Sequence, residues 1–313
     1  MKLYKYMDDS TALKFLDDPY FRITPRLALN DPFEVLLSGV TSEQLNTLSI
    51  QHNNELNNNF STYFNNFMSS HGVISLSESY DNLLMWAHYA KDHKGLVIEL
   101  DIDDINPFSI FNSYNIPKSS DACFTKVNYR KERHYTDNIT PEKIERDVAL
   151  HYYRTKSDEW IYEKEWRFIV PFNVANKILV NLNIKGSKQA LEYLNISLDK
   201  KSGVVDITNQ VNKADPAELK KLAVVFTNSH KNGFIFLVGL NEKKLRRLFL
   251  GINSNLDEIA PKLAHAFNSP YITYKSIIDD CYQGVYQATQ HPNRFELVFN
   301  LFQGNKNSTG TSE

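Results

Sequence analysis

Hydrophobic and charged side chains alternate over residues 163–170, near the middle of the chain. Alternation with a period of two predicts a β-strand with two different faces. One face is apolar, because every second residue is Trp, Phe or Val, whereas the opposite face carries Glu163, Glu165 and Arg167. Side chains two residues apart on one face are about 6–7 Å apart. This spacing suits a bidentate pair between Arg167 and one carboxylate, with a second carboxylate close by.

The charged face has two interpretations. Ion pairs on the surface of a sheet are common and can be purely structural. Alternatively, crowding raises the pKa of one carboxyl group while the arginine keeps the other ionised, an arrangement that suits catalysis.

The remaining hydrophobic pattern predicts both strands and helices. Short apolar runs bounded by turn residues predict strands at 3–7, 21–24, 72–78, 96–101, 124–129, 222–226, 233–237, 245–251, 271–278 and 286–302. Helical spacing predicts helices at 11–16, 41–67, 82–93, 140–156 and 256–267. We expect Asp81 to cap the helix at 82–93 and Gly95 to end it. The mixture predicts an α+β fold with mixed, mainly antiparallel sheets and flanking helices.

The chain shows no convincing linker, so we expect a single domain over residues 1–303 and a disordered polar tail at 304–313.

The 313 residues carry a net charge of −2, which argues against a broad basic surface for nucleic acid. Cys123 and Cys281 lie far apart, as expected for free thiols in the cytoplasm. We find no signal peptide and no apolar run of about 18 residues, so no membrane association is expected.

Metal chemistry has little support in the sequence, and we expect no metal. His88 and His93 are five residues apart, whereas a zinc pair on a helix needs a spacing of four. A nuclease-like Glu-x-Lys pattern occurs at Glu242 and Lys244, without an evident partner aspartate. No nucleophile elbow or P-loop occurs.

The remaining candidates form a polar sheet surface with aromatic walls. Ser75 and Ser77 would share a face with Glu165 and Arg167 if their strands lie in one sheet. Hydroxyls, a carboxylate, an arginine and stacked rings suit an extended dinucleotide. The expected ligand-contacting residues are Tyr4, Lys5, Tyr6, Asn30, Asp31, Ser75, Ser77, Trp86, His88 and Tyr89.

Several motifs occur in a fixed order and carry a family resemblance. They are Leu3-Tyr4-Lys5-Tyr6, Leu29-Asn30-Asp31-Pro32-Phe33-Glu34, Ser75-Leu76-Ser77, Met85-Trp86-Ala87-His88-Tyr89-Ala90 and Glu163-Lys164-Glu165-Trp166-Arg167. Over about residues 3–290 the chain resembles a widespread bacterial family known mainly as a domain of unknown function. Residues 173–221 look longer than the family's core and would be an insertion or a variable segment. We associate the family with the ADP-ribosyltransferase-like fold.

This resemblance implies an enzyme that uses NAD as substrate. It would cleave the nicotinamide–ribose bond and transfer ADP-ribose to a protein or nucleic acid. Glu165 would be the catalytic carboxylate, oriented by Arg167 or Glu163. Lys5 and Tyr6 stand where the fold's opening strand carries His or Arg. Members of such families are often toxins or anti-phage effectors, which implies a partner in a defence system. The alternatives are a non-catalytic sensor or interaction protein and, third, a nuclease.

Overall fold

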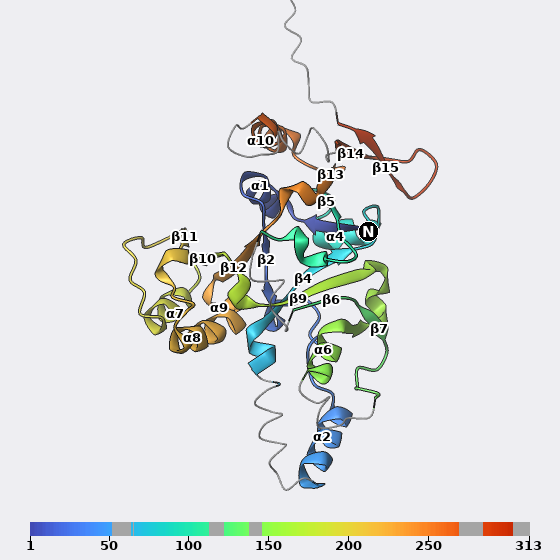
Figure 1. The fold of residues 1–313 in the computed structure, drawn as a ribbon. Helices are drawn as coiled ribbons and strands as arrows, with labels where there is room; N and C mark the ends of the chain where they lie inside the picture. Colours follow the sequence, from blue (N-terminus) through green and yellow to red (C-terminus); the bar gives the residue numbers. More distant parts are fainter. Residues whose placement is uncertain (52–63, 65, 113–121, 138–145, 269–283, 303–313) are drawn as a thin grey trace, which may run out of the picture. The chain divides into compact units, whose positions relative to one another are not determined.

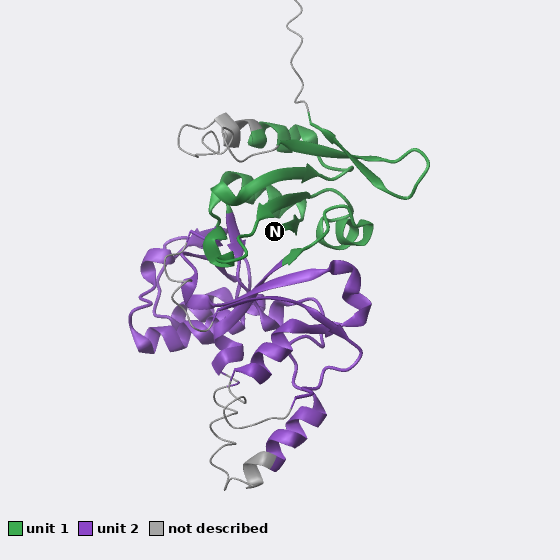
Figure 2. Cartoon of the chain, turned by 45° about the vertical axis from the view of Figure 1, so that its right-hand side comes forward, with its two compact units in different colours: residues 1–19, 76–110, 240–313 green, residues 20–75, 111–239 purple. Residues whose placement is uncertain are grey.

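The computed structural model describes residues 1–51, 64, 66–112, 122–137, 146–268 and 284–302. It confirms a mixed α+β fold with mostly antiparallel strand pairs (Figure 1). The chain forms two compact units, each assembled from segments that are distant in sequence (Figure 2). Unit 1 comprises Met1–Pro19, Leu76–Ile110 and Leu240–Glu313, and unit 2 comprises Tyr20–Ser75 and Phe111–Gly239. None of the described helices has the length and apolar character needed to cross a membrane.

Unit 1 is built around a buried strand, β5 (Leu96–Asp101), whose residues are all buried except the last. Apart from Glu99 these buried residues are apolar, as expected of a strand that is covered on both faces. β5 pairs antiparallel with β1 (Lys2–Met7) and β13 (Leu245–Leu250). Beyond β13 follow β14 (Val285–Gln290), which is parallel to β13, and β15 (Leu297–Leu301). The helical segments of unit 1 are α1 (Asp9–Asp17), α4 (Leu83–Tyr89), α10 (Leu256–Asn268), η2 (Pro107–Ile110) and η7 (Glu242–Lys244).

The helix predicted at 82–93 is shorter than expected at both ends. α4 begins after Asn82, whose side chain accepts hydrogen bonds from the amides of Leu84 and Met85, so the cap is Asn82 rather than Asp81. The helix ends at Tyr89 because the residues at 91–93 have positive φ angles of 47°, 55° and 63°. Three successive left-handed residues cannot continue a right-handed helix.

Gly95 does not end this helix, contrary to the prediction, because it lies six residues beyond Tyr89. Its role is a close approach to β1. A Cβ atom at Gly95 would collide with the carbonyl oxygen of Met7. Glycine is therefore required here for packing and not for a helix stop.

Unit 2 contains three groups of strands. In the first group, β4 (His71–Ser77), which belongs to unit 2 as far as Ser75, lies next to β9 (Glu165–Pro171). β4 also pairs with β3 (Thr24–Pro25), and β9 pairs with β6 (Cys123–Lys126). A separate antiparallel sheet has the order β11 (Val204–Asp206), β10 (Lys177–Asn181), β12 (Phe234–Gly239) and β2 (Tyr20–Arg22). β7 (Asn128–Arg130) is parallel to β8 (Thr155–Ser157). The helical segments are α2 (Gly39–Gln51), α6 (Asp147–Arg154), α7 (Ser187–Tyr193), α8 (Pro216–Thr227), α9 (Ser229–Asn232), η1 (Arg26–Ala28), η4 (Asp158–Glu163), η5 (Phe172–Val174) and η6 (Thr208–Gln210).

Two predictions that concern the helices of unit 2 are wrong. Residues 222–226 were predicted to form a strand, but they lie in α8, which starts with Pro216 after an Asp215 cap. That cap and the proline at the first position begin a helix that continues through the apolar run. Lys156 was placed at the end of a helix, but the described helix α6 ends at Arg154 and Lys156 lies in β8.

Other predicted segments lie outside the described residues in whole or in part. The predicted helix at 41–67 corresponds to α2 as far as Gln51, and residues 52–63 are not described. The segments at 138–145, 271–278 and 304–313 and the second cysteine, Cys281, also lie outside the described part of the chain.

The core that supports the functional region of unit 2 lies between α2, α6, β4 and β9. It contains Val35, Leu45, Phe64, Phe67, Met68, Val73, Tyr135, Val148, Ala149, Tyr152, Tyr153 and Ile169. Tyr153 also donates hydrogen bonds to the carbonyl oxygens of Met68 and His71, which ties α6 to the start of β4.

Candidate functional site: a buried charge network beside a pocket

β9 carries the charged side chains that the sequence predicted. Arg167 donates from Nε to Glu165 Oε1 and from Nη2 to Glu165 Oε2, both at 2.8 Å. The predicted bidentate pair is therefore present. The residue Arg167 is only 1% exposed, so the pair lies inside unit 2 and not on a solvated sheet surface.

Glu163 reaches the same region from a different element. The prediction placed it in the strand, but it ends η4, and Lys164 follows in a left-handed conformation with φ 46° and ψ 51°. The resulting turn interrupts the expected alternation before β9 begins at Glu165. Glu163 is nonetheless buried and contacts the network through Lys156.

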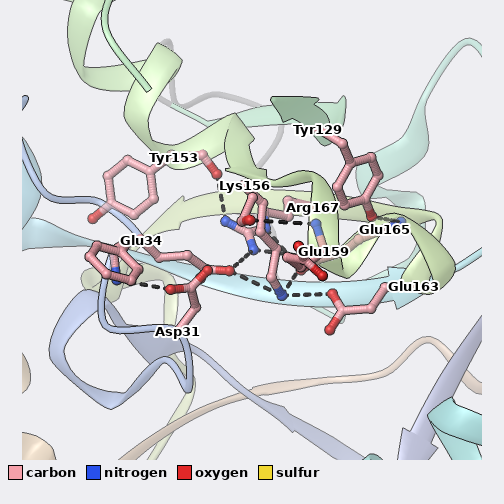
Figure 3. A network of polar contacts seen from close by, with 11 residues as sticks. Asp31, Glu34, Tyr129, Tyr153, Lys156, Glu159, Glu163, Glu165 and Arg167 are labelled. Atoms are coloured by element: carbon pink, nitrogen blue, oxygen red, sulfur yellow. Dashed lines mark hydrogen bonds and ion pairs between the residues drawn. The ribbon is translucent and has the colours of Figure 1, made fainter. Parts of the chain in front are cut away.

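Two further side chains complete the network (Figure 3). Glu34 Oε1 accepts from Arg167 Nη2 at 2.9 Å and lies 3.0 Å from Lys156 Nζ. Lys156 Nζ lies between carboxylates, 2.6 Å from Glu163 and 3.6 Å from Glu165. Arg167 Nη1 donates to the carbonyl oxygen of Tyr153 at 2.8 Å.

The network carries an excess of negative charge. Three carboxylates and two cations give a formal charge of −1, and no more than 5% of any of the five side chains is exposed. Buried charges are tolerated only when they are paired. Here each cation contacts at least two carboxylates, which meets this requirement.

The electrostatics of Glu165 follow from this pairing. Burial alone would raise the pKa of Glu165, but the charge and hydrogen bonds of Arg167, together with Lys156 and Ser75, lower this pKa to about 2. For Lys156, burial lowers the pKa, and the neighbouring carboxylates more than offset this and raise it. Glu165 is therefore ionised and Lys156 protonated at neutral pH.

A pocket of about 330 Å³ adjoins the network. Its volume lies at the lower end of the range for small-molecule sites, about 300–1,000 Å³. Glu34 and Lys156 of the network are among its walls. The full lining is Asp31, Phe33, Glu34, Arg130, Lys131, Arg133, Thr155, Lys156 and Ser157.

Three of these lining residues have a buried polar atom without a hydrogen-bond partner in the described part of the chain. They are Asp31 through Oδ2, Glu34 through Oε2 and Thr155 through Oγ1. The other oxygen of Asp31 accepts from the amide of Phe33 at 2.9 Å, a turn contact that is typical of aspartate before proline. A buried, unsatisfied oxygen is costly, so atoms of this kind indicate that something else donates to them.

The structure brings together five of the residues that the sequence singled out, all within unit 2. Glu163, Glu165 and Arg167 belong to the network, Ser75 forms a hydrogen bond with Glu165, and Asp31 lines the pocket. Asn30 precedes Asp31 and is exposed. Sequence reasoning missed the roles of Glu34 and Lys156, and the cations at 130, 131 and 133 around the pocket. Glu34 ends the family motif at residues 29–34, and its place in that motif could have identified it as a candidate site residue.

The other expected ligand-contacting residues belong to unit 1. They are Tyr4, Lys5, Tyr6, Ser77, Trp86, His88 and Tyr89. Several of them use their polar atoms within unit 1. The hydroxyl of Tyr4 donates to Glu99 at 3.1 Å and that of Tyr6 to the carbonyl oxygen of Ser79 at 2.9 Å. Trp86 is fully buried, whereas His88 is exposed.

Metal ligands do not gather in the described ranges. No group of three or more His, Cys, Asp or Glu side chains there could hold a metal ion. The Glu-x-Lys pattern of Glu242 and Lys244 lies in η7 of unit 1.

Comparison with known proteins gives a result for one part of the chain. No curated protein and no solved structure matches the chain. A family model does match residues 85–168, which include Lys156 and the charged residues of β9 but not Glu34. Residues 85–168 of this chain thus match the family described as Protein of unknown function (DUF2971), which confirms the expected resemblance to a domain-of-unknown-function family.

Proposed function

We propose that the chain is an NAD-using enzyme that breaks the nicotinamide–ribose bond and transfers ADP-ribose to a protein or nucleic acid. The observation that carries this proposal is the pocket beside the buried network, in which the carboxylate of Glu34 forms part of the wall. Loss of nicotinamide leaves positive charge on the ribose, as in an oxocarbenium ion. A fixed carboxylate next to that charge stabilises the transition state.

Within this proposal Glu34 is the carboxylate nearest to the reacting sugar. Its Oε1 atom is held by Arg167 and Lys156, while its Oε2 atom has no hydrogen-bond partner among the described residues. Glu165, which the sequence favoured as the catalytic residue, is not among the pocket-lining residues. Glu165 would act by positioning Arg167, which in turn holds Glu34. The defence or toxin role implied by the family resemblance, with its partner protein, belongs to the same proposal.

The test is nicotinamide release from NAD, followed by proton NMR, together with transfer of labelled ADP-ribose to protein and nucleic acid. We expect release by the wild type and a loss of about a hundredfold or more in Glu34→Gln, because one electrostatic contact to the transition state is typically worth this much. Glu43→Gln, which alters an exposed glutamate in α2, is the matched control and should retain full activity. Circular dichroism confirms that each variant is folded. Unchanged release by folded Glu34→Gln would refute the assignment.

A non-catalytic sensor is the second candidate, and the pairing of Glu165 favours it. Both oxygens of this carboxylate accept from Arg167, as in a structural ion pair. A sensor would be stabilised by NAD or ADP-ribose without consuming it. Bound ligand at about 100 times its dissociation constant stabilises the folded state by about 2.7 kcal/mol, which a thermal-shift assay detects. Stabilisation by NAD without release of nicotinamide would therefore favour the sensor.

A further inference from the structure

The two acidic residues that line the pocket are suited to hydroxyl donors. Asp31 and Glu34 are 5% and 7% exposed, and each presents one carboxylate oxygen without a hydrogen-bond partner in the described ranges. Carboxylates commonly accept hydrogen bonds from ribose hydroxyls. Thr155, whose hydroxyl also lacks a partner among these residues, adds a group that can donate or accept.

The basic residues that line the same pocket are suited to an anion. Arg130, Lys131 and Arg133 all line it, and none of them forms an ion pair with another described residue. With Lys156, four of the nine lining residues are basic and only two are acidic. This balance disfavours a metal cation as the missing partner of the carboxylates. Arginine side chains bind phosphate oxygens in a bidentate manner.

An aromatic ring lies at the edge of the pocket. Phe33 is 62% exposed, although Glu34, which follows it, is buried. The guanidinium carbon of Arg133 lies 5.5 Å from the centre of its ring. An exposed ring beside an arginine offers a surface on which a planar base can stack.

We propose that this pocket binds a ribonucleoside phosphate, with its ribose hydroxyls on Asp31 and Glu34 and its phosphate on Arg130 and Arg133. The inference deepens the proposed function and rests on it for the choice of a nucleotide as ligand. It adds the recognition of the sugar and of the phosphate by named residues, which the reaction alone does not specify. Because Glu34 is placed at the reacting sugar, this ribose is the nicotinamide ribose of NAD, and AMP serves as a probe for that half because it is also a ribonucleoside 5′-phosphate.

Isothermal titration calorimetry of the full chain with three probes tests the proposal: AMP, 2′,3′-dideoxy-AMP and inorganic phosphate. We expect AMP to bind the wild type about tenfold or more tightly than the dideoxy analogue, since a hydrogen bond to a charged group is lost. Asp31→Asn keeps the side-chain oxygen that caps Phe33 but replaces the free acceptor with an amide donor. In this variant the preference for AMP over dideoxy-AMP should fall but not vanish, because one hydroxyl loses its charged acceptor while Glu34 still accepts from the other.

Arg130→Gln separates phosphate recognition from sugar recognition. We expect it to weaken AMP about tenfold or more while retaining the preference for AMP over the dideoxy analogue. Arg294→Gln, which alters an exposed arginine of unit 1, is the control and should bind like the wild type. Absence of AMP binding to the wild type, equal binding of AMP and dideoxy-AMP, or unchanged binding by Arg130→Gln would each overturn the proposal.

Turnover of NAD by the same proteins distinguishes failure of this inference from failure of the proposed function. If AMP binding follows the expected pattern but no nicotinamide is released, the nucleotide site stands and the NAD-cleaving function fails. If nicotinamide is released and the Asp31 and Arg130 variants bind AMP and turn over NAD like the wild type, the inference is overturned and the enzyme assignment stands.

Discussion

Replacing Arg167 with methionine should destabilise unit 2 more than replacing Glu165 with glutamine. The wild-type network has three carboxylates and two cations, a formal charge of −1. Arg167→Met leaves three buried carboxylates with Lys156 alone, a charge of −2, and removes the hydrogen bonds to Glu165 and Glu34. Leaving a buried charge without its partner costs about 3–5 kcal/mol.

Glu165→Gln has the opposite effect on the charge balance. Two carboxylates and two cations remain, so the network becomes neutral, and the amide oxygen of glutamine can still accept from Arg167. The expected cost is about 1.5–3 kcal/mol, the value of a hydrogen bond to a charged group. The order of the two variants therefore follows from the count of buried charges rather than from the number of contacts removed.

Urea unfolding followed by tryptophan fluorescence measures both effects. Trp160 and Trp166 lie in unit 2, and Lys156 Nζ lies 4.6 Å from the centre of the Trp160 ring, so the signal reports on this region. A loss of 3–5 kcal/mol should lower the midpoint by about 1–2 M urea. Lys220→Met, an exposed substitution in α8, is the control for loss of a positive charge. The reasoning is refuted if Arg167→Met unfolds at the wild-type midpoint, or if Glu165→Gln is the less stable of the two.

Three further predictions follow from the same structure. Because the pKa of Glu165 is lowered from 4.5 to about 2 in the folded state, its ionised form contributes stability that is present above about pH 4.5 and is lost as the pH falls towards 2. The urea midpoint of the wild type should thus fall more between pH 5 and pH 3 than that of Glu165→Gln, and parallel profiles would contradict this. Gly95→Ala should lower the melting temperature strongly or prevent folding, because the added Cβ would collide with the carbonyl oxygen of Met7. Gly39→Ala is the control and should have little effect, since no atom lies within 4 Å of the added carbon. Equal melting temperatures of the two variants would be inconsistent with this packing. AMP binding measured by calorimetry should weaken steadily between 50 and 200 mM salt, because the partly exposed arginines that line the pocket are screened by salt. Salt-independent binding would argue against a phosphate contact.

The strand at the centre of the site was predictable because its signal is local. Alternation identified the apolar and charged faces of β9, and residue spacing alone predicted the pairing of Arg167 with Glu165. The N-terminal end of the stretch was not predictable in this way. Lys164 adopts a left-handed conformation that the local sequence pattern does not predict. The resulting turn places Glu163 in η4 and not in the strand.

The partners of the charged row were harder to predict because they are distant in sequence. Glu34 is 133 residues from Arg167, and no periodicity connects the two. The strand position of Lys156 was not predicted, because the helical pattern of the sequence continues past the actual end of α6 at Arg154. In the structure β8 begins at Thr155, directly after the helix. The pocket depends on both of these residues and on β7. The position of the pocket could therefore be identified only from the tertiary structure of unit 2, and no sequence motif predicts it.

The aromatic residues at the start of the chain and on α4 illustrate a different limit. Tyr6 and Trp86 were expected to contact a ligand, but their rings lie 5.6 Å apart, edge to face, in unit 1. Trp86 Nε1 donates to the carbonyl oxygen of Tyr80 at 2.7 Å. Composition and helical spacing cannot distinguish an aromatic side chain that packs in a core from one that lines a pocket.

The most direct measurement is a crystal structure of the chain with ADP-ribose, because it locates the nucleotide as well as showing that it binds. We predict density in the pocket of unit 2, with a ribose hydroxyl within about 3.2 Å of the Asp31 or Glu34 carboxylate and a phosphate beside Arg130 or Arg133. ADP-ribose bound elsewhere on the chain, with this pocket holding only water, would contradict it.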